Sequence, residues 1–176
     1  MHLFHFIIIP LTFASWALGA PVATSSEATI LTDLRSVSDS VGEITTSLSA
    51  FGGTADQGYQ VQVALSSFYQ QGQQLVQDAS ASGNYTGSAS RDITTRPVQI
   101  SDGFNDCVDK LIVKKDAFAS IGQQGIILGL ITVIKELDTQ IFESLEAKLS
   151  VPDAATAASF QDQVEAKLQL VINQYS

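Results

Sequence analysis

Residues 27–53 read EATILTDLRSVSDSVGEITTSLSAFGG, and the spacing of their apolar residues decides the fold class. Large apolar side chains recur along this stretch at alternating steps of four and three residues, which places them on one side of an α-helix. They are Ile30, Leu34, Val37, Val41, Ile44, Leu48 and Phe51. Such a seam is typical of a helix that packs against other helices, and Gly52 and Gly53 are expected to end it.

Four further segments carry apolar stripes with helical spacing, over residues 61–79, 104–118, 127–149 and 157–175. Glycines at positions 122 and 125 separate the third stripe from the fourth, and residues 150–153 separate the fourth from the fifth. No segment shows the two-residue period of a strand. We therefore expect an all-α fold, a bundle of five helices that are mostly antiparallel.

Residues 83–100 lack this periodicity and are rich in Gly, Ser and Thr, so we expect an exposed connection there. Ser101 would then cap the third helix. The connection contains Asn84-Tyr85-Thr86, a sequon for N-glycosylation, and its expected exposure favours modification of Asn84. Because such tripeptides are common, a chance occurrence is the alternative.

The first nineteen residues have the pattern of a secretory signal peptide. An apolar run too short to span a bilayer precedes Ala17-Leu18-Gly19, whose small residues at alternate positions suit signal peptidase. We expect cleavage after Gly19, which leaves residues 20–176 as a single helical domain that is extracellular or associated with the cell wall. No apolar tail follows Leu170, so neither a transmembrane segment nor a lipid anchor is expected.

Composition then removes most catalytic chemistry from residues 20–176. Both histidines, His2 and His5, precede the cleavage site, so no His-based catalytic group or ordinary His metal site remains, and Cys107 is the only cysteine. Cys107 lies on an apolar stripe, and we expect a small buried side chain. We predict no enzyme, no catalytic residue, no metal and no cofactor, with a carboxylate-based hydrolase as the remaining enzymatic alternative.

The surface composition also restricts the partners. Net charge is −9, which argues against nucleic acid and anionic membranes. Charged residues make up 15% of the chain, below the usual figure of about 25%. Ser, Thr and Gln fill the polar positions instead. This weakly charged surface is compatible with contact to apolar material.

Several segments of the C-terminal half resemble one fungal family. They are Leu111-Ile112-Val113-Lys114-Lys115-Asp116-Ala117-Phe118, the following break at residues 122–125, the Leu137-Asp138-Thr139 step, the Leu149-Ser150-Val151-Pro152 junction and the closing residues 171–176. Together with the first helix ending at Phe51-Gly52-Gly53, they resemble hydrophobic surface-binding protein A and the cell-wall galactomannoproteins. The resemblance covers most of residues 26–82 and 104–176. The aperiodic residues 83–100 depart from the family and put a closed ligand cavity in doubt.

The resemblance implies a secreted or wall-associated, non-enzymatic protein that adsorbs to hydrophobic surfaces or encloses a fatty acid inside the bundle. Cell-wall polysaccharide and secreted hydrolases are further partners that it suggests. The alternative reading is a structural wall mannoprotein or surface antigen whose carbohydrate is the functional part. The sequon at Asn84 and the Ser/Thr-rich connection motivate that alternative.

An enclosed acyl chain is expected to run along the fourth helix. Residues 126–134 are apolar nearly all round, which suggests that they lie at the centre of the molecule. The candidate lining residues are Phe68, Leu111, Phe118, Ile127, Leu130, Ile134, Phe160 and Val164. Lys110, Lys114 and Lys115 could neutralise a fatty-acid carboxylate, although solvation of the third helix explains them more simply.

Overall fold

The computed structural model describes residues 26–176, except for the side chains of residues 98–102. The described chain is helical throughout, with short connections and no strand, so the all-α prediction is confirmed. The expected signal peptide, residues 1–19, lies outside the described residues. The helices are α1 (Glu27–Ala50), α2 (Ala55–Ala81), α3 (Gly87–Ser120), α4 (Gln124–Glu146) and α5 (Val151–Tyr175).

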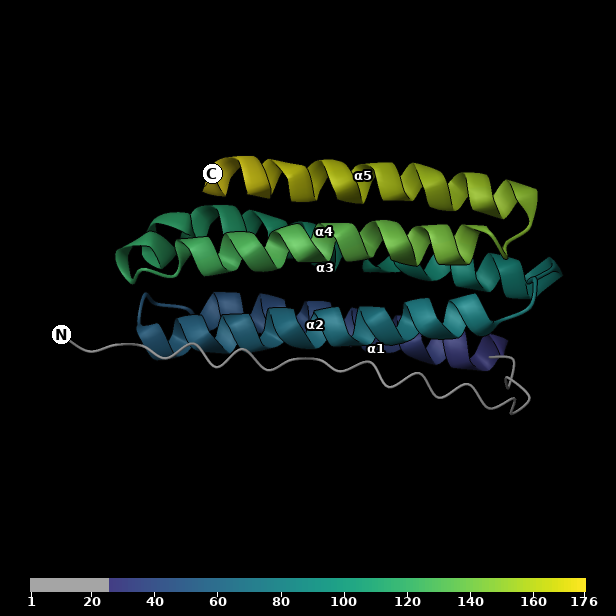
Figure 1. Ribbon diagram of the computed structural model, residues 1–176, viewed down its shortest axis with the longest axis horizontal. Helices are drawn as coiled ribbons and strands as arrows, with labels where there is room; N and C mark the ends of the chain where they lie inside the picture. Colours follow the sequence, from purple (N-terminus) through teal and green to yellow (C-terminus); the bar gives the residue numbers. More distant parts are fainter. Residues whose placement is uncertain (1–25) are drawn as a thin grey trace, which may run out of the picture.

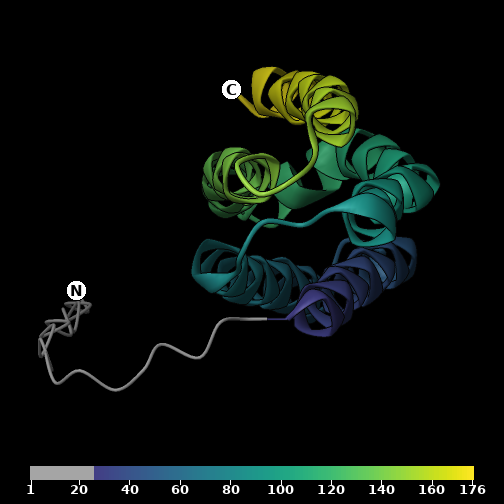
Figure 2. The same ribbon diagram turned by 90° about the vertical axis from the view of Figure 1, so that its right-hand side faces the viewer.

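The helices form a closed ring when the molecule is viewed along its long axis (Figure 2). α1 packs against α2 and α3, α2 also packs against α4, and α5 closes the ring by contacting both α3 and α4. α3 and α4 are consecutive in the chain but share only a small contact. The order around the ring is therefore α1, α2, α4, α5 and α3, and every helix turns one face toward a common axis.

Successive helices run in opposite directions along the chain (Figure 1). Neighbours in the ring do not follow the same rule, because α1 with α3, α2 with α4, and α3 with α5 run parallel. Among ring neighbours, the contacts of α1 with α2 and of α4 with α5 join antiparallel helices. The expected antiparallel packing holds for helices joined by short connections, whereas three of the five ring neighbours are parallel because the ring places helices side by side that are two apart in the chain.

The helix ends follow from residues that the sequence had marked. Gly53, with φ of 96°, follows α1, and Thr54 then caps α2 in a capping box with Gln57. Gly122, with φ of 71°, separates α3 from α4 in a conformation that favours glycine. Ser150 occupies the N-cap position of α5, with Pro152 in its first turn. These three breaks are where the sequence predicted them.

The expected exposed connection over residues 83–100 is wrong. α3 begins at Gly87 and runs for 34 residues, so the connection is limited to residues 82–86, and Ser101 lies inside the helix instead of capping it. The inward positions of this segment include Ser90 and Thr94, which are buried beside Ile93. Thr94 Oγ1 donates a hydrogen bond to the Ser90 carbonyl at 2.9 Å.

Ser90 also accepts a hydrogen bond from the Ser150 backbone N–H at 2.8 Å, which ties α3 to the start of α5. These satisfied hydroxyl groups replace apolar side chains at inward positions, and this hid the helical period from the sequence. The wall of the bundle that the sequence left in doubt is therefore helical.

The expected central position of residues 126–134 is also wrong. Ile126 is 50% exposed and Val133 is 40% exposed, while Gly129 is exposed and Leu130 is half-buried. These four residues form a second apolar stripe on the outer face of α4, opposite the buried stripe that includes Ile127, Ile131 and Ile134. α4 is one wall of the ring, and its all-round apolar character arises from two separate faces.

A glycine allows the close approach of α2 and α4. Gly72 is buried, and a Cβ atom there would lie 2.7 Å from Leu137 Cδ2 and 3.2 Å from Ile141 Cδ1. Gly42 on α1 is exposed, and a Cβ atom there would meet nothing within 4 Å. The two positions provide a matched pair of helical glycines.

We predict that Gly72→Val destabilises the protein by about 1–3 kcal/mol, because the added side chain must push α4 away from α2. Gly42→Val should change the free energy of unfolding by less than about 0.5 kcal/mol, since valine replaces glycine at an open helical position. Chemical denaturation of both variants measures the difference. Equal effects at the two positions would contradict the close packing of α2 on α4.

Candidate functional site: an apolar pocket at the centre of the ring

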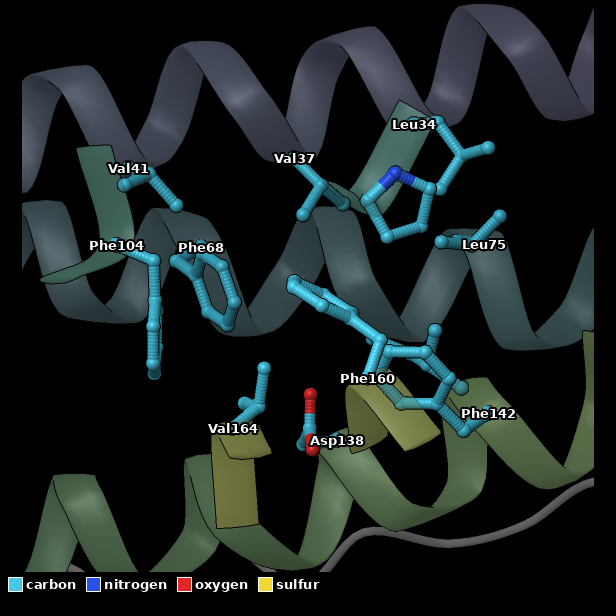
Figure 3. A pocket seen from close by; sticks show the side chains of 12 residues that line it. Leu34, Val37, Val41, Phe68, Leu75, Phe104, Asp138, Phe142, Phe160 and Val164 are labelled. Atoms are coloured by element: carbon cyan, nitrogen blue, oxygen red, sulfur yellow. The ribbon is translucent and has the colours of Figure 1, made fainter. Parts of the chain in front are cut away.

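The axis of the ring contains a pocket to which all the helices contribute. Its lining residues are Leu34, Val37 and Val41 from α1, Phe68 and Leu75 from α2, Pro97 and Phe104 from α3, Asp138, Ile141 and Phe142 from α4, and Phe160 and Val164 from α5. Figure 3 shows these side chains converging from opposite walls on a common space. Apart from Asp138, the described side chains of this lining are apolar.

The unfilled space is narrow. About 510 Å³ of the pocket is free of protein atoms, including its open mouth, and about 60 Å³ of it admits the centre of a water-sized sphere. The rings of Phe142 and Phe160 lie against each other with centroids 5.9 Å apart, and they occupy part of the space. Pockets for small molecules commonly span ~300–1,000 Å³, so a long ligand requires these side chains to move outward.

A second apolar space adjoins the pocket along the ring axis. The two spaces share Val41, Phe68 and Phe104 as common walls. Beyond them the second space is lined by Ile44, Leu65, Cys107, Val108, Leu111, Ile131, Ile134 and Leu168. The two adjoining spaces together form an apolar tract, which one hydrocarbon chain could occupy if the shared side chains moved aside.

A groove between α3 and α5 lies on the outer side of the pocket. Phe104, Phe160 and Val164 line both the groove and the pocket, so they separate the two spaces. The groove admits water-sized spheres over about 500 Å³, and its polar side chains include Asn105 and Lys167. An amphipathic ligand could reach the ring axis through this groove if the three shared side chains moved aside.

Asp138 is the unusual member of the lining. Its side chain is 9% exposed, and Oδ2 is buried without a hydrogen-bond partner. Burial, and then the nearby negative charge of Glu165, raise the pKa of Asp138 to about 7. Glu165 itself accepts hydrogen bonds from Thr139 at 2.9 Å and Gln161 at 2.8 Å, which lower its pKa. The carboxyl group of Asp138 therefore lies in an apolar space and titrates near pH 7.

Five of the eight candidate lining residues come together around this tract. Phe68, Phe160 and Val164 line the first space, and Leu111 and Ile134 line the second. The other three lie elsewhere. Ile127 is fully buried in the core outside both linings, and Leu130 lies half-buried as part of the outer stripe of α4.

Phe118 closes one end of the bundle instead of lining the pocket. Its ring stacks on Phe51 with centroids 4.2 Å apart. At the same end, Lys114 donates a hydrogen bond to the Phe51 carbonyl at 2.6 Å, and Tyr175 Oη donates to the Leu111 carbonyl at 2.7 Å. Lys114 therefore has a structural role.

The other two lysines that the sequence singled out do not line these spaces either. Lys110 pairs with Asp106 one helical turn earlier, and Lys115 is absent from the described linings of the pocket and the groove. Lys167 on α5 is the cationic residue that lines the groove, and sequence reasoning did not select it.

Sequence reasoning also missed the α1 wall and Asp138. Leu34, Val37 and Val41 were assigned to the packing seam, which cannot be distinguished from a pocket wall by periodicity. Asp138 could have been found, because it stands four residues after Ile134 and three before Ile141. An acidic residue on the apolar stripe of a helix is a recognisable anomaly.

Two other predicted sites take definite positions. Asn84 is exposed in the short connection between α2 and α3, next to the buried Tyr85. Cys107 is a free thiol buried against the second space, and burial raises its pKa to about 12, so it behaves as a small apolar side chain. Within residues 26–176, no group of three metal-binding side chains comes together.

The fold and the pocket define a class of all-helical proteins with an apolar cavity between the helices. The match to the family described as hydrophobic surface binding protein A, over residues 27–147, shows that the chain belongs to that family, as the resemblance implied. No curated protein sequence matches the chain significantly.

Solved structures show the same fold at low sequence identity. The structure of Afmp4p in complex with palmitic acid is similar, with a TM-score of 0.84, 20% identity, and coverage of 86% of this chain and 100% of that chain. Ligand binding domain 1 of the Penicillium marneffei MP1 protein, complexed with arachidonic acids, has a TM-score of 0.80 at 15% identity. The match covers 86% of this chain and 99% of that domain.

Domain 2 of the same MP1 protein, complexed with multiple arachidonic acids, has a TM-score of 0.79 at 14% identity and covers 86% of this chain and 96% of that domain.

Over the part of the chain that the structure describes, none of the helices is both long and apolar enough to cross a membrane.

The raised pKa of Asp138 makes a prediction about stability. A carboxyl whose folded-state pKa exceeds its unfolded value of about 3.9 favours the folded state at low pH, and that contribution is lost as the pH rises to about 7. Asp138→Asn should therefore stabilise the protein by roughly 2 kcal/mol at pH 8, and the gain should vanish near pH 4.

Urea denaturation of both proteins at the two pH values measures this difference. Burial and the neighbouring Asp78 raise the pKa of Asp33 to about 6. Ionisation of Asp33 therefore also lowers the stability of the wild type as the pH rises. The variant must therefore be compared with the wild type at each pH. A stability difference that does not change with pH would argue against a buried, titrating Asp138.

Proposed function

We propose that this protein is a non-enzymatic binder of long-chain fatty acids or chemically similar lipids, which it holds along the axis of the helical ring. The observation that carries the proposal is the apolar tract formed by side chains from every helix. The palmitic acid and arachidonic acid complexes of proteins with this fold support it. A carboxylate-based hydrolase has less support, because Asp138 is the one acidic residue among the described pocket residues.

Ligand entry through the groove between α3 and α5 fits this function. The three side chains shared by groove and pocket, Phe104, Phe160 and Val164, would have to move for an acyl chain to enter. The narrow free space of the pocket suggests that binding widens the ring, with side-chain rotation of the phenylalanines as the smallest sufficient change.

We predict that Val164→Phe weakens fatty-acid binding at least tenfold, because the larger ring fills the space that the acyl chain needs. Val113→Phe is the matched control, since Val113 lies on α3 with 78% of its surface exposed. Displacement of a fluorescent fatty acid by palmitate measures both affinities, and circular dichroism checks that helicity is kept. Unaltered binding by Val164→Phe would place the ligand away from the ring axis.

Adsorption to hydrophobic surfaces is a second candidate function, in line with the description of the family. The outer stripe of α4, formed by Ile126, Gly129, Leu130 and Val133, supports it. These residues follow one another at steps of three, one and three positions, so they lie on one face of the helix. That face can contact an apolar surface without any change in the fold.

The double variant Ile126→Ser, Val133→Ser should reduce adsorption to polystyrene several-fold, because it removes the two most exposed large side chains of the outer stripe. Fatty-acid binding should not change, since neither residue lines the pocket. Val113→Ser removes a valine that is more exposed, at 78%, from another helix and serves as control. If the control lowers adsorption as much as the double variant, the outer stripe is not the adsorbing surface.

Secretion and glycosylation complete the proposal. The apolar segment before Gly19 supports export to the extracellular space or cell wall, and the exposure of Asn84 supports an N-linked glycan there. Retention in the cell wall without extractable lipid would favour the alternative, a structural wall mannoprotein. Cell-wall polysaccharide and secreted hydrolases stay as suggested partners. Fractionation of cultures, followed by mass spectrometry of lipid that copurifies with the protein, distinguishes the two functions.

A further inference from the structure

The carboxyl group of Asp138 lies where a ligand in the pocket would contact it. Figure 3 shows it pointing from α4 into the space between Val164 and Phe160, toward the wall formed by α1 and α2. Its side chain is 91% buried, and Oδ2 has no hydrogen-bond partner. The pocket thus has an apolar lining with one unsatisfied hydrogen-bond acceptor.

The surrounding helices provide no hydrogen-bond donor to Asp138 Oδ2. The described pocket residues of α1, α2 and α3 are apolar, and the charge that acts on Asp138 from α5 is that of Glu165, which has the same sign. The hydrogen bonds from Thr139 and Gln161, and the positive charge of Lys135, act on Glu165. An unpartnered buried carboxyl costs stability, and an apolar residue of similar size would pack here without that cost.

We propose that Asp138 accepts a hydrogen bond from the polar end of the bound lipid, so that the pocket prefers lipids with an uncharged O–H donor over lipids with an ionised carboxylate. This inference rests on the proposed function, since it requires a lipid in the pocket. It adds the chemical class of the polar end, which is an alcohol or a protonated carboxylic acid.

Both protonation states of Asp138 can receive such a donor, because each leaves an oxygen lone pair free. An ionised carboxylate on the lipid offers no donor, and in this apolar space it would repel an ionised Asp138. A methyl ester also lacks the donor but carries no charge. Palmitic acid, 1-hexadecanol and methyl palmitate therefore separate the hydrogen bond from the charge.

Lys167 offers the competing arrangement. It lies in the groove between α3 and α5, where it could hold an ionised carboxylate while the acyl chain enters the pocket. In that arrangement the polar end lies outside the ring and Asp138 meets only hydrocarbon. The effects of substitutions at Asp138 and Lys167 on the same three lipids distinguish the two arrangements.

The experiment measures displacement of a fluorescent fatty acid by the three lipids from wild type, Asp138→Leu, Asp138→Asn and Lys167→Gln. Wild type should bind 1-hexadecanol about tenfold more tightly than methyl palmitate, which corresponds to one hydrogen bond to a buried carboxyl. Asp138→Leu should abolish this preference and keep methyl palmitate binding. At pH 8.5, Asp138→Asn should bind palmitate about tenfold more tightly than wild type, because the repelling charge is gone.

Thermal melts establish that each variant is folded, and Asp138→Asn, which is close in shape to aspartate, covers the case in which the leucine variant fails to fold. An unchanged preference for 1-hexadecanol in folded Asp138→Leu, or equal palmitate binding at pH 8.5 by Asp138→Asn and wild type, overturns the inference but leaves lipid binding intact. A tenfold loss of palmitate binding in Lys167→Gln, with no effect at Asp138, also overturns it. If wild type binds none of the three lipids, the proposed function itself fails.

Discussion

The arrangement of five helices around one axis is the constraint from which the other features follow. Neighbouring helix axes pack about 8–10 Å apart, so in a five-membered ring the centre is roughly 7–9 Å from each axis. A helix with its side chains has a radius of only ~5–6 Å. The ring axis can therefore be filled only by long side chains from several helices or by a guest molecule. Here Phe68, Phe104, Phe142 and Phe160 reach inward and leave a narrow continuous space between them.

This geometry explains why the chain combines a well-packed periphery with a loosely filled axis. Each helix contact in the ring is close, as the buried Gly72 against Leu137 illustrates. The axis instead depends on rotatable aromatic side chains, and it contains a carboxyl group that no other residue satisfies. The flanks of each stripe thus hold the ring together, and its innermost residues line the pocket; under the proposed function, stability and ligand binding depend on different layers of the same helices.

The sequence was sufficient for the helices but not for their arrangement. The stripe from Ile30 to Phe51 must be apolar wherever its helix lies, so periodicity predicted the helix without its neighbours. The same reasoning failed for the start of α3, where hydrogen-bonded Ser90 and Thr94 replace apolar residues. It also placed α4 wrongly at the centre, because periodicity does not tell which of two apolar faces meets another helix. Asp138 was overlooked, although its position on the apolar stripe between Ile134 and Ile141 marked it as an anomaly.

The position of α5 as the last helix of the ring has a consequence for how the protein is made. The match to the family ends at residue 147, before α5 begins at Val151. α5 closes the ring by packing between α3 and α4. Until α5 has been synthesised and has packed, the ring has a gap, and the inner phenylalanines of the other helices face it. The pocket-lining faces that α5 covers when it closes the gap are, under the proposed function, also the faces that contact the lipid. A lipid present during synthesis could therefore act as a template for the final folding step.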